Sequence, residues 1–170
     1  MKLRNGFKIC MVLTVSAVLT LTGISRSDAV SFTGLGDLAG GSLFSQAFGI
    51  SGDGSTVVGR GNSSSGNEAF RWTSGGGMVG LGDLAGGSFS SISLGASSDG
   101  SVVVGQGTST SGQEAFRWTS GGGMVGLGDL EGGSFSSSAR GVSGDGLVVV
   151  GHGTSTSGQE AFRWTSRGGM

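Results

Sequence analysis

The sequence predicts an all-β repeat protein made of three 46-residue, four-stranded units that resemble propeller blades. The first observation is the repeat itself, because Trp72, Trp118 and Trp164 are 46 residues apart. The second is that short apolar runs of good strand formers alternate with glycine-rich and serine-rich segments typical of turns. A β-solenoid stays open as the alternative, in which two rungs of about half this length would fill each unit.

Each unit is expected to hold four strands, as the middle copy illustrates. The first strand covers residues 88–95. The second covers 101–105, after an Asp99-Gly100 pair that favours a tight hairpin turn. The third covers 114–119 and follows a polar loop at 107–113, and the fourth covers 124–127 after three glycines.

The third strand predicts how neighbouring sheets pack. Side chains alternate between the two faces of a strand, so Phe116 and Trp118 share one face while Ala115 and Arg117 share the other. The aromatic face is expected to pack against a neighbouring sheet. The structural positions of the repeat are therefore Glu68, Phe70, Trp72, Glu114, Phe116, Trp118, Glu160, Phe162 and Trp164.

The units are expected at about 31–78, 79–124 and 125–170, offset by one strand from a complete unit. Residues 31–35 align with the fourth strand, and the sequence ends at Met170, just before that strand in the last unit. Three units are fewer than the four or so that usually close a propeller. Two readings stay open: a fragment of a longer array, or head-to-tail self-association in which the N-terminal strand completes another molecule's last unit.

Residues 1–29 have the pattern of a secretory signal peptide. Lys2, Arg4 and Lys8 precede a 13-residue apolar stretch from Ile9 to Leu21, and Ala29 ends a small-x-small site. The stretch is shorter than the roughly 20 residues that span a bilayer. We therefore expect a secreted or cell-surface protein that meets the membrane only through its export signal.

Charge argues against nucleic-acid binding. After Ala29 the chain has six arginines, no lysine and ten acidic residues, which gives a net charge of −4. Such a chain lacks the basic surface of a nucleic-acid binder. The one cysteine, Cys10, lies inside the apolar stretch, so no disulfide is expected in the exported chain.

The repeat resembles the HAF-type extracellular repeat. The resemblance lies in residues 114–119, 122–124, 127–130, 142–146 and 148–151, and it extends over nearly the whole chain after the signal. It implies an exported bacterial protein with no established catalytic activity. Where the family usually has His-Ala-Phe, this sequence has glutamate, so any role of that histidine is lost at Glu68, Glu114 and Glu160.

No set of residues predicts catalysis or a bound cofactor. His152 is the one histidine, and its sister positions hold Arg60 and Gln106, which fits an exposed loop residue better than a catalytic base. Zinc would need three or four suitable ligands. Calcium stays open as a weak alternative, because three turn carboxylates are available in Asp53, Asp99 and Asp145.

We therefore expect an exported non-enzymatic protein that acts as a scaffold, adhesin or binding module. Its partner would be an unidentified extracellular ligand or protein. The positions that vary among units, 43–50, 60–65 and 106–112, are expected at the rims, where binding surfaces usually lie. Two alternatives stay open: a secreted carbohydrate-active or other propeller enzyme that uses the repeated carboxylates, and a truncated gene product without an independent function.

Overall fold

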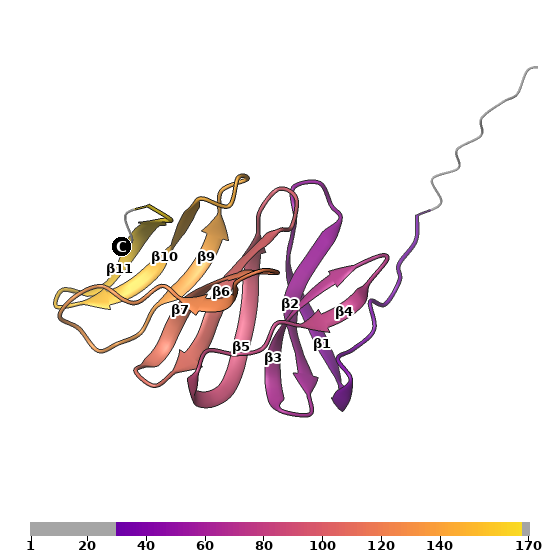
Figure 1. The fold of residues 1–170 in the computed structure, drawn as a ribbon, viewed down its shortest axis with the longest axis horizontal. Coiled ribbons are helices and arrows are strands. Elements are labelled where there is room, and N and C mark those ends of the chain that lie inside the picture. Colours follow the sequence, from indigo (N-terminus) through magenta and orange to yellow (C-terminus); the bar gives the residue numbers. More distant parts are fainter. Residues whose placement is uncertain (1–29, 168–170) are drawn as a thin grey trace, which may run out of the picture. The chain divides into compact units, whose positions relative to one another are not determined.

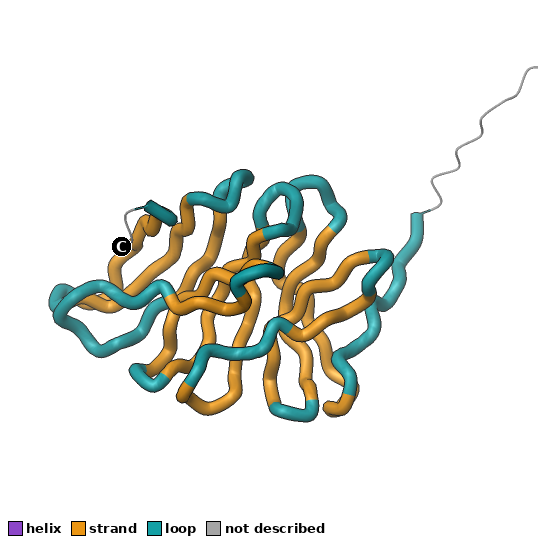
Figure 2. The backbone as a smooth tube through the Cα atoms, in the orientation of Figure 1, coloured by secondary structure: helices purple, strands orange, loops and turns teal. Residues whose placement is uncertain are grey.

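The computed structural model describes residues 30–167, and the expected signal peptide at 1–29 lies outside this range. The chain divides into two units, Met1–Thr33 and Gly34–Met170, and every described strand belongs to the second. This unit is all-β, and Figure 2 shows strands joined by loops and turns. No described segment forms a helix long and apolar enough to cross a membrane.

The strands form three antiparallel meanders that follow one another along the chain (Figure 1). The first meander contains β1 (Gly40–Ile50), β2 (Thr56–Ser63), β3 (Gly66–Thr73) and β4 (Gly77–Gly80). The second contains β5 (Gly86–Ala96), β6 (Val102–Ser109), β7 (Gly112–Thr119) and β8 (Gly123–Gly126). The third contains β9 (Ser138–Val142), β10 (Val148–Ser155) and β11 (Gly158–Thr165). The sheets are open, and one parallel bridge between Asn67 and Ser90 links the first meander to the second.

Hydrogen bonding places the fourth strand beside the third strand of the same meander. β4 pairs with β3 through Arg71↔Val79, and β8 pairs with β7 through Arg117↔Val125. The fourth strand therefore completes the meander that precedes it. Residues 31–35 align with that strand, yet residues 30–38 form no strand within the described chain.

The prediction of a polar loop at 107–113 is wrong, because most of these residues lie in strands. β6 runs to Ser109 and β7 begins at Gly112, so only Thr110 and Ser111 form the turn. Gly112, the first residue after the turn, has a φ of 135°, which glycine adopts more readily than other residues. His152 is likewise not in a loop, since it lies in β10 with Ser138 and Ala161 as its cross-strand partners.

Two hydrophobic cores lie between successive meanders. In the first, Val58 and Ala69 of the first meander meet Val103 and Phe116 of the second, and Trp118 packs against this core. In the second core, four equivalent residues form the same contact between the second and third meanders: Val104, Ala115, Val149 and Phe162. The prediction that the aromatic face of the third strand packs against a neighbouring sheet is confirmed for Phe116 and Phe162.

Candidate functional site

The turn between the first two strands of each meander is closed by its own aspartate. In the second meander, Asp99 Oδ1 accepts hydrogen bonds from the Ser97 hydroxyl at 2.7 Å and from the Ser101 backbone N–H at 3.0 Å. Ser97 Oγ in turn accepts from the Val102 N–H at 3.0 Å. This pattern satisfies backbone groups that a turn would otherwise leave unpaired.

These hydrogen bonds stabilise the charged form of the carboxylate. The Ser101 N–H, with the Ser97 and Ser101 hydroxyls, lowers the pKa of Asp99 to about 2. The pKa of Asp53 is lowered chiefly by the Ser51 hydroxyl, and that of Asp145 chiefly by the Ser143 hydroxyl. The turn aspartates are therefore charged at neutral pH and already bound to their own turns.

The three turn aspartates do not converge into one site. Asp53 and Asp145 accept bonds from Ser51 and Ser143 of their own turns, as Asp99 does from Ser97. Across residues 30–167, no three His, Cys, Asp or Glu side chains gather where they could hold a metal ion. Each turn thus offers one carboxylate, whereas calcium takes six to eight oxygen ligands.

The repeated glutamates hold the loop that follows the fourth strand. Glu68 Oε1 accepts from the Gly82 N–H at 2.9 Å, and Glu114 Oε1 accepts from the Gly128 N–H at 3.0 Å. Glu160 is exposed and instead accepts a hydrogen bond from the Ser155 hydroxyl. The first two carboxylates thus serve the scaffold.

In the first two meanders, the repeated arginine connects its meander to the turn of the next one. Arg71 donates from Nε to the Gly100 carbonyl at 3.1 Å and from Nη2 to Thr56 Oγ1 at 3.2 Å. Arg117 donates from Nε to the Gly146 carbonyl at 3.3 Å. The turns also touch directly, because the Asp53 N–H donates to the Ser98 carbonyl at 2.9 Å.

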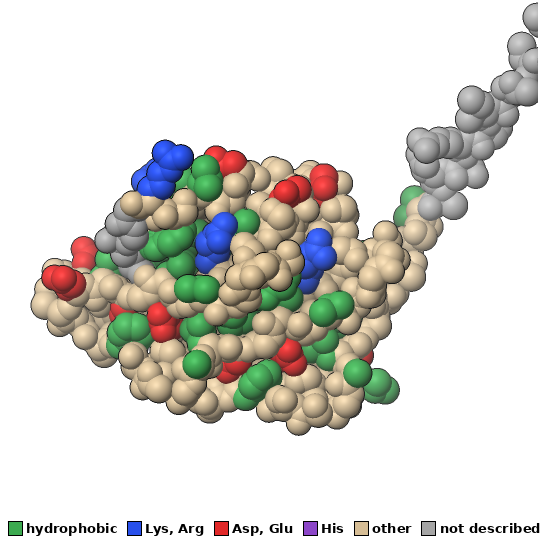
Figure 3. All heavy atoms as spheres, in the orientation of Figure 1, with side chains coloured by type: hydrophobic (Ala, Val, Ile, Leu, Met, Phe, Trp, Pro, Cys, Tyr) green, Lys and Arg blue, Asp and Glu red, His purple; other side chains and the backbone are tan. Residues whose placement is uncertain are grey.

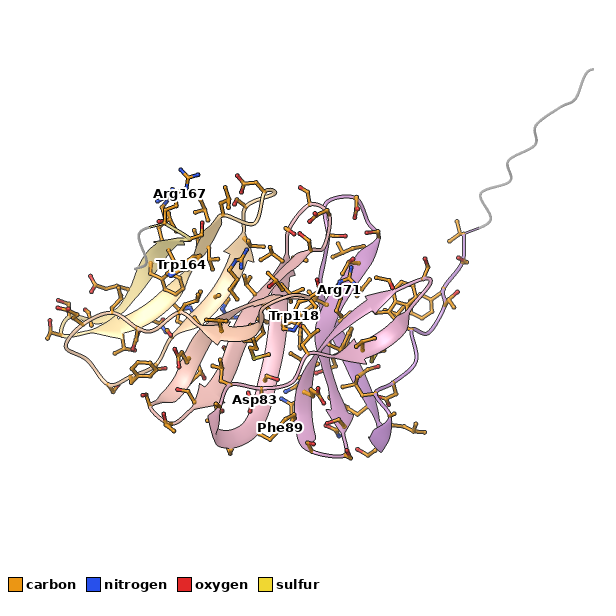
Figure 4. The ribbon with its side chains drawn as sticks, in the orientation of Figure 1. Arg71, Asp83, Phe89, Trp118, Trp164 and Arg167 are labelled. Carbon is orange, nitrogen blue, oxygen red and sulfur yellow. The ribbon has the colours of Figure 1, made fainter. Side chains whose placement is uncertain are left out.

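A recess of about 230 Å³ opens where the first meander meets the second. Its lining residues are Arg71, Asp99, Gly100, Ser101, Trp118 and Ser120. Figure 4 shows Arg71 and Trp118 next to each other at this junction. The indole of Trp118 provides an apolar surface, and the serine hydroxyls, Asp99 and Arg71 surround it with donors and acceptors. The recess thus offers a small ligand one aromatic ring and several hydrogen-bonding groups.

A larger recess of about 390 Å³ lies in the first meander, along Leu38, Ser63–Ser65, Glu68 and Met78–Gly80. Glu68 is its one charged side chain, and that carboxylate already accepts the Gly82 N–H. The other lining residues are three serines, Gly80 and four apolar residues. The recess beside Trp118 is the better candidate site, because it combines an aromatic ring with both signs of charge.

Sequence reasoning placed Trp118 and Asp99 in separate roles and did not single out Arg71. The arginines recur at 71, 117 and 163 with the repeat interval, which was the available signal. Arg71 lies beside Trp118 and the Asp99 turn only because two meanders are in contact.

The variable segment 43–50 lies in β1. There the guanidinium of Arg60 stacks on the rings of Phe44 and Phe48, at 5.4 and 5.9 Å from the ring centres.

Comparison with solved structures finds a likeness to TolB from Acinetobacter baumannii, with a TM-score of 0.52 and 15% sequence identity. The match covers 72% of this chain and 30% of that chain. This chain thus spans less than a third of the length of TolB, and at this identity the likeness concerns the fold alone. No protein-family model matches the chain, and no curated protein matches it.

Proposed function

We propose that this chain is an exported, propeller-type repeat protein that works by binding, as an adhesin, scaffold or ligand-binding module, and not by catalysis. The observation that carries the proposal is the recess beside Trp118, with its polar rim. The propeller-type arrangement is supported by the side-by-side antiparallel meanders and by the likeness in fold to TolB, a β-propeller neighbour. Export is supported by the charged and apolar pattern of residues 2–21.

The use of the charged side chains favours binding over catalysis. A general acid or base must be free to exchange a proton with a substrate near the working pH. Glu68 and Glu114 accept backbone N–H groups, and Asp99 has a pKa of about 2, so it remains charged and unprotonated in neutral solution. These carboxylates are suited to holding turns and loops.

The lining of the recess favours a polyhydroxylated ligand, such as one residue of a cell-surface polysaccharide. Asp99 and the hydroxyls of Ser101 and Ser120 supply acceptors and donors for ligand hydroxyls. Trp118 supplies an apolar surface against which the carbon face of a sugar ring can lie. The face drawn in Figure 3 is mostly backbone and side chains that are neither charged nor hydrophobic, with scattered arginines, acidic residues and apolar side chains.

Calorimetric titration with neutral and uronic-acid oligosaccharides of equal length tests the proposal. We expect saturable binding that weakens roughly thirtyfold in Trp118→Leu, since truncating an aromatic anchor costs about 2 kcal/mol. Trp72→Leu is the matched control, because Trp72 holds the same repeat position but does not line this recess. Equal weakening in both variants, or no binding by the wild type, would contradict the proposed site.

The export signal has its own test. After expression of the full chain in a bacterial host, the protein should be found in the cell-envelope or medium fraction. Its N-terminal residue, identified by mass spectrometry, should be Val30. Substituting Leu13 and Leu19 by arginine should keep the full-length chain inside the cell, because the apolar stretch no longer enters the export machinery. An intact N-terminus in wild-type protein from every fraction would be evidence against cleavage after Ala29.

A further inference from the structure

The same contact between meanders is built twice within the chain. We call the face that carries Val58 and Ala69 the front of a meander, and the face that carries the phenylalanine of the third strand its back. The front of the first meander packs on the back of the second, and Val58 and Ala69 are 0% exposed there. The front of the second packs on the back of the third, and Val104 and Ala115 are also 0% exposed.

The front of the third meander is uncovered. Val150 occupies the position of Val58 and Val104, yet it is 46% exposed. Ala161 occupies the position of Ala69 and Ala115, and it too is exposed. This face therefore presents to solvent the apolar surface that the other two meanders bury.

Along β1 the back of the first meander is uncovered as well, whereas Phe70 in β3 is buried within the chain. Ser45 and Ala47 are exposed, whereas the residues at the same positions in β5 and β9 and just before β9 are fully buried. Those buried equivalents are Ser91, Ser93, Ser137 and Ala139. Ile50, on the same side as Val57, is 61% exposed. One chain thus carries both halves of its own repeated interface.

Backbone and hydroxyl groups at the two uncovered faces also match. The Ala69 N–H donates to Ser91 Oγ at 3.0 Å, and the Ala115 N–H donates to Ser137 Oγ at 2.9 Å. By the repeat, the corresponding groups are the Ala161 N–H on one uncovered face and Ser45 Oγ on the other. An apolar contact that also pairs these groups meets the requirement that buried polar groups be hydrogen-bonded.

The open edge of β11 has a matching strand at the other end of the chain. β3 and β7 each pair with a fourth strand, through Arg71↔Val79 and Arg117↔Val125, whereas the third meander has none within the described residues. Thr33 lies 46 residues before Val79, in a segment that aligns with that strand. The leucine that follows each existing fourth strand donates its backbone N–H to the third strand. The Leu81 N–H donates to the Ala69 carbonyl at 2.9 Å, and the Leu127 N–H donates to the Ala115 carbonyl at 2.8 Å. Leu35 is their equivalent.

We propose that a second copy of this chain covers these faces, head to tail. The front of the third meander of one copy packs on the back of the first meander of the other, and residues 32–36 of that other copy form the fourth strand along β11. The Leu35 N–H of one copy then donates to the Ala161 carbonyl of the other, and the Gly36 N–H donates to the side-chain carboxylate of Glu160. The contact is heterologous, and in a closed pair of copies related by a two-fold axis it is used twice and leaves neither face exposed.

A mass measurement in solution, by light scattering during gel filtration, tests the assembly. Wild-type protein should have twice the mass of one chain, and Val150→Glu should have the mass of one chain. Val125→Glu is the matched control, because Val125 is 56% exposed on β8 and belongs to neither uncovered face. Single-chain mass for the wild type at every concentration, or equal dissociation by both variants, overturns the proposal.

A disulfide tests the exchanged strand itself. By the pairs Arg71↔Val79 and Arg117↔Val125, Thr33 of one copy should face Arg163 of the other. In a Cys10→Ser background, Thr33→Cys with Arg163→Cys should form a dimer on non-reducing gels, since facing residues of paired strands lie within disulfide reach. Thr33→Cys with Arg117→Cys should not, because β8 already occupies that edge. Crosslinking within one chain, or equally in both pairs, overturns the exchanged strand.

Discussion

Asp99 shows, at the scale of one residue, how this chain uses a carboxylate. Its turn supplies two hydroxyl donors and one backbone donor, and together they lower its pKa to about 2. Protonation would weaken these three hydrogen bonds, because a neutral carboxyl group is a poorer acceptor than a carboxylate. The side chain therefore acts as a fixed charged acceptor that closes the turn between β5 and β6.

Removing one donor should raise the pKa of Asp99. In Ser97→Ala the carboxylate loses its 2.7 Å hydroxyl bond, so its pKa should move up toward the ordinary value near 3.8. Carboxyl carbon shifts followed by NMR over pH 1.5–6 would measure it. Ser120→Ala, at a nearby exposed serine that does not bond to Asp99, should leave the pKa at about 2.

The sign of the pH effect on stability follows from the same shift. Because the pKa of Asp99 is lower in the folded chain than its ordinary value of 3.8, its contribution to stability is present above about pH 4. It is lost as the pH falls from about 4 to about 2. Asp99→Asn should flatten the acid arm of a plot of thermal midpoint against pH, and an unchanged arm would count against this contribution.

Glu114 is expected to matter for stability because it holds the Gly128 N–H. Glu114→Ala leaves that half-buried donor without its partner, which should cost about 1–3 kcal/mol in urea unfolding. Glu131→Ala changes an exposed glutamate of the following loop and should stay within about 0.5 kcal/mol of wild type. If the glutamates served catalysis alone, both variants would unfold like the wild type.

Among the elements, the second strand of each meander approaches its neighbour closely at glycine. A Cβ on Gly105 would lie 1.9 Å from the Ile92 carbonyl oxygen and 2.9 Å from the Phe116 ring. Gly59 and Gly151 have the same close approach, with 1.9 Å to the Gln46 carbonyl and 2.0 Å to the Ser138 carbonyl. These glycines let the first strand pack against the second above a buried phenylalanine.

Gly105→Ala should therefore force β5 and β6 apart. We expect a loss of about 3 kcal/mol in urea unfolding, at the upper end of what overpacking costs. Gly121→Ala is the control, because a Cβ there meets nothing within 4 Å and the residue lies in an exposed turn. Equal stability of the two variants would show that the backbone yields easily at Gly105.

Local rules explain which elements the sequence predicts well. The Asp99-Gly100 turn follows from the positive φ of 65° that Gly100 supplies, and the opposite faces of Ala115 and Phe116 follow from strand alternation. The continuation of the second strand over 106–109 was missed, because its Gln, Gly, Thr and Ser residues favour loops when taken alone. Pairing with β7 overrides that preference. The recess of Arg71 and Trp118 was missed because it needs two meanders in contact.

At the scale of the whole molecule, the repeated charged side chains stabilise the three meanders and the contacts between them. Aspartates close the turns, glutamates hold the loops after β4 and β8, and arginines link successive meanders. Two faces that match each other remain uncovered at the ends, around Val150 and Ile50. The junction beside Trp118 offers a ligand both a ring and polar groups.

Saturation-transfer NMR of the protein with a neutral oligosaccharide, followed for a day in one sample, tests binding against catalysis most directly. We predict transfer to the sugar protons that is lost in Trp118→Leu and kept in Trp72→Leu, with an oligosaccharide spectrum that does not change over time. New anomeric signals from cleaved sugar, or the absence of any transfer in the wild type, would contradict a protein that works by binding at this recess.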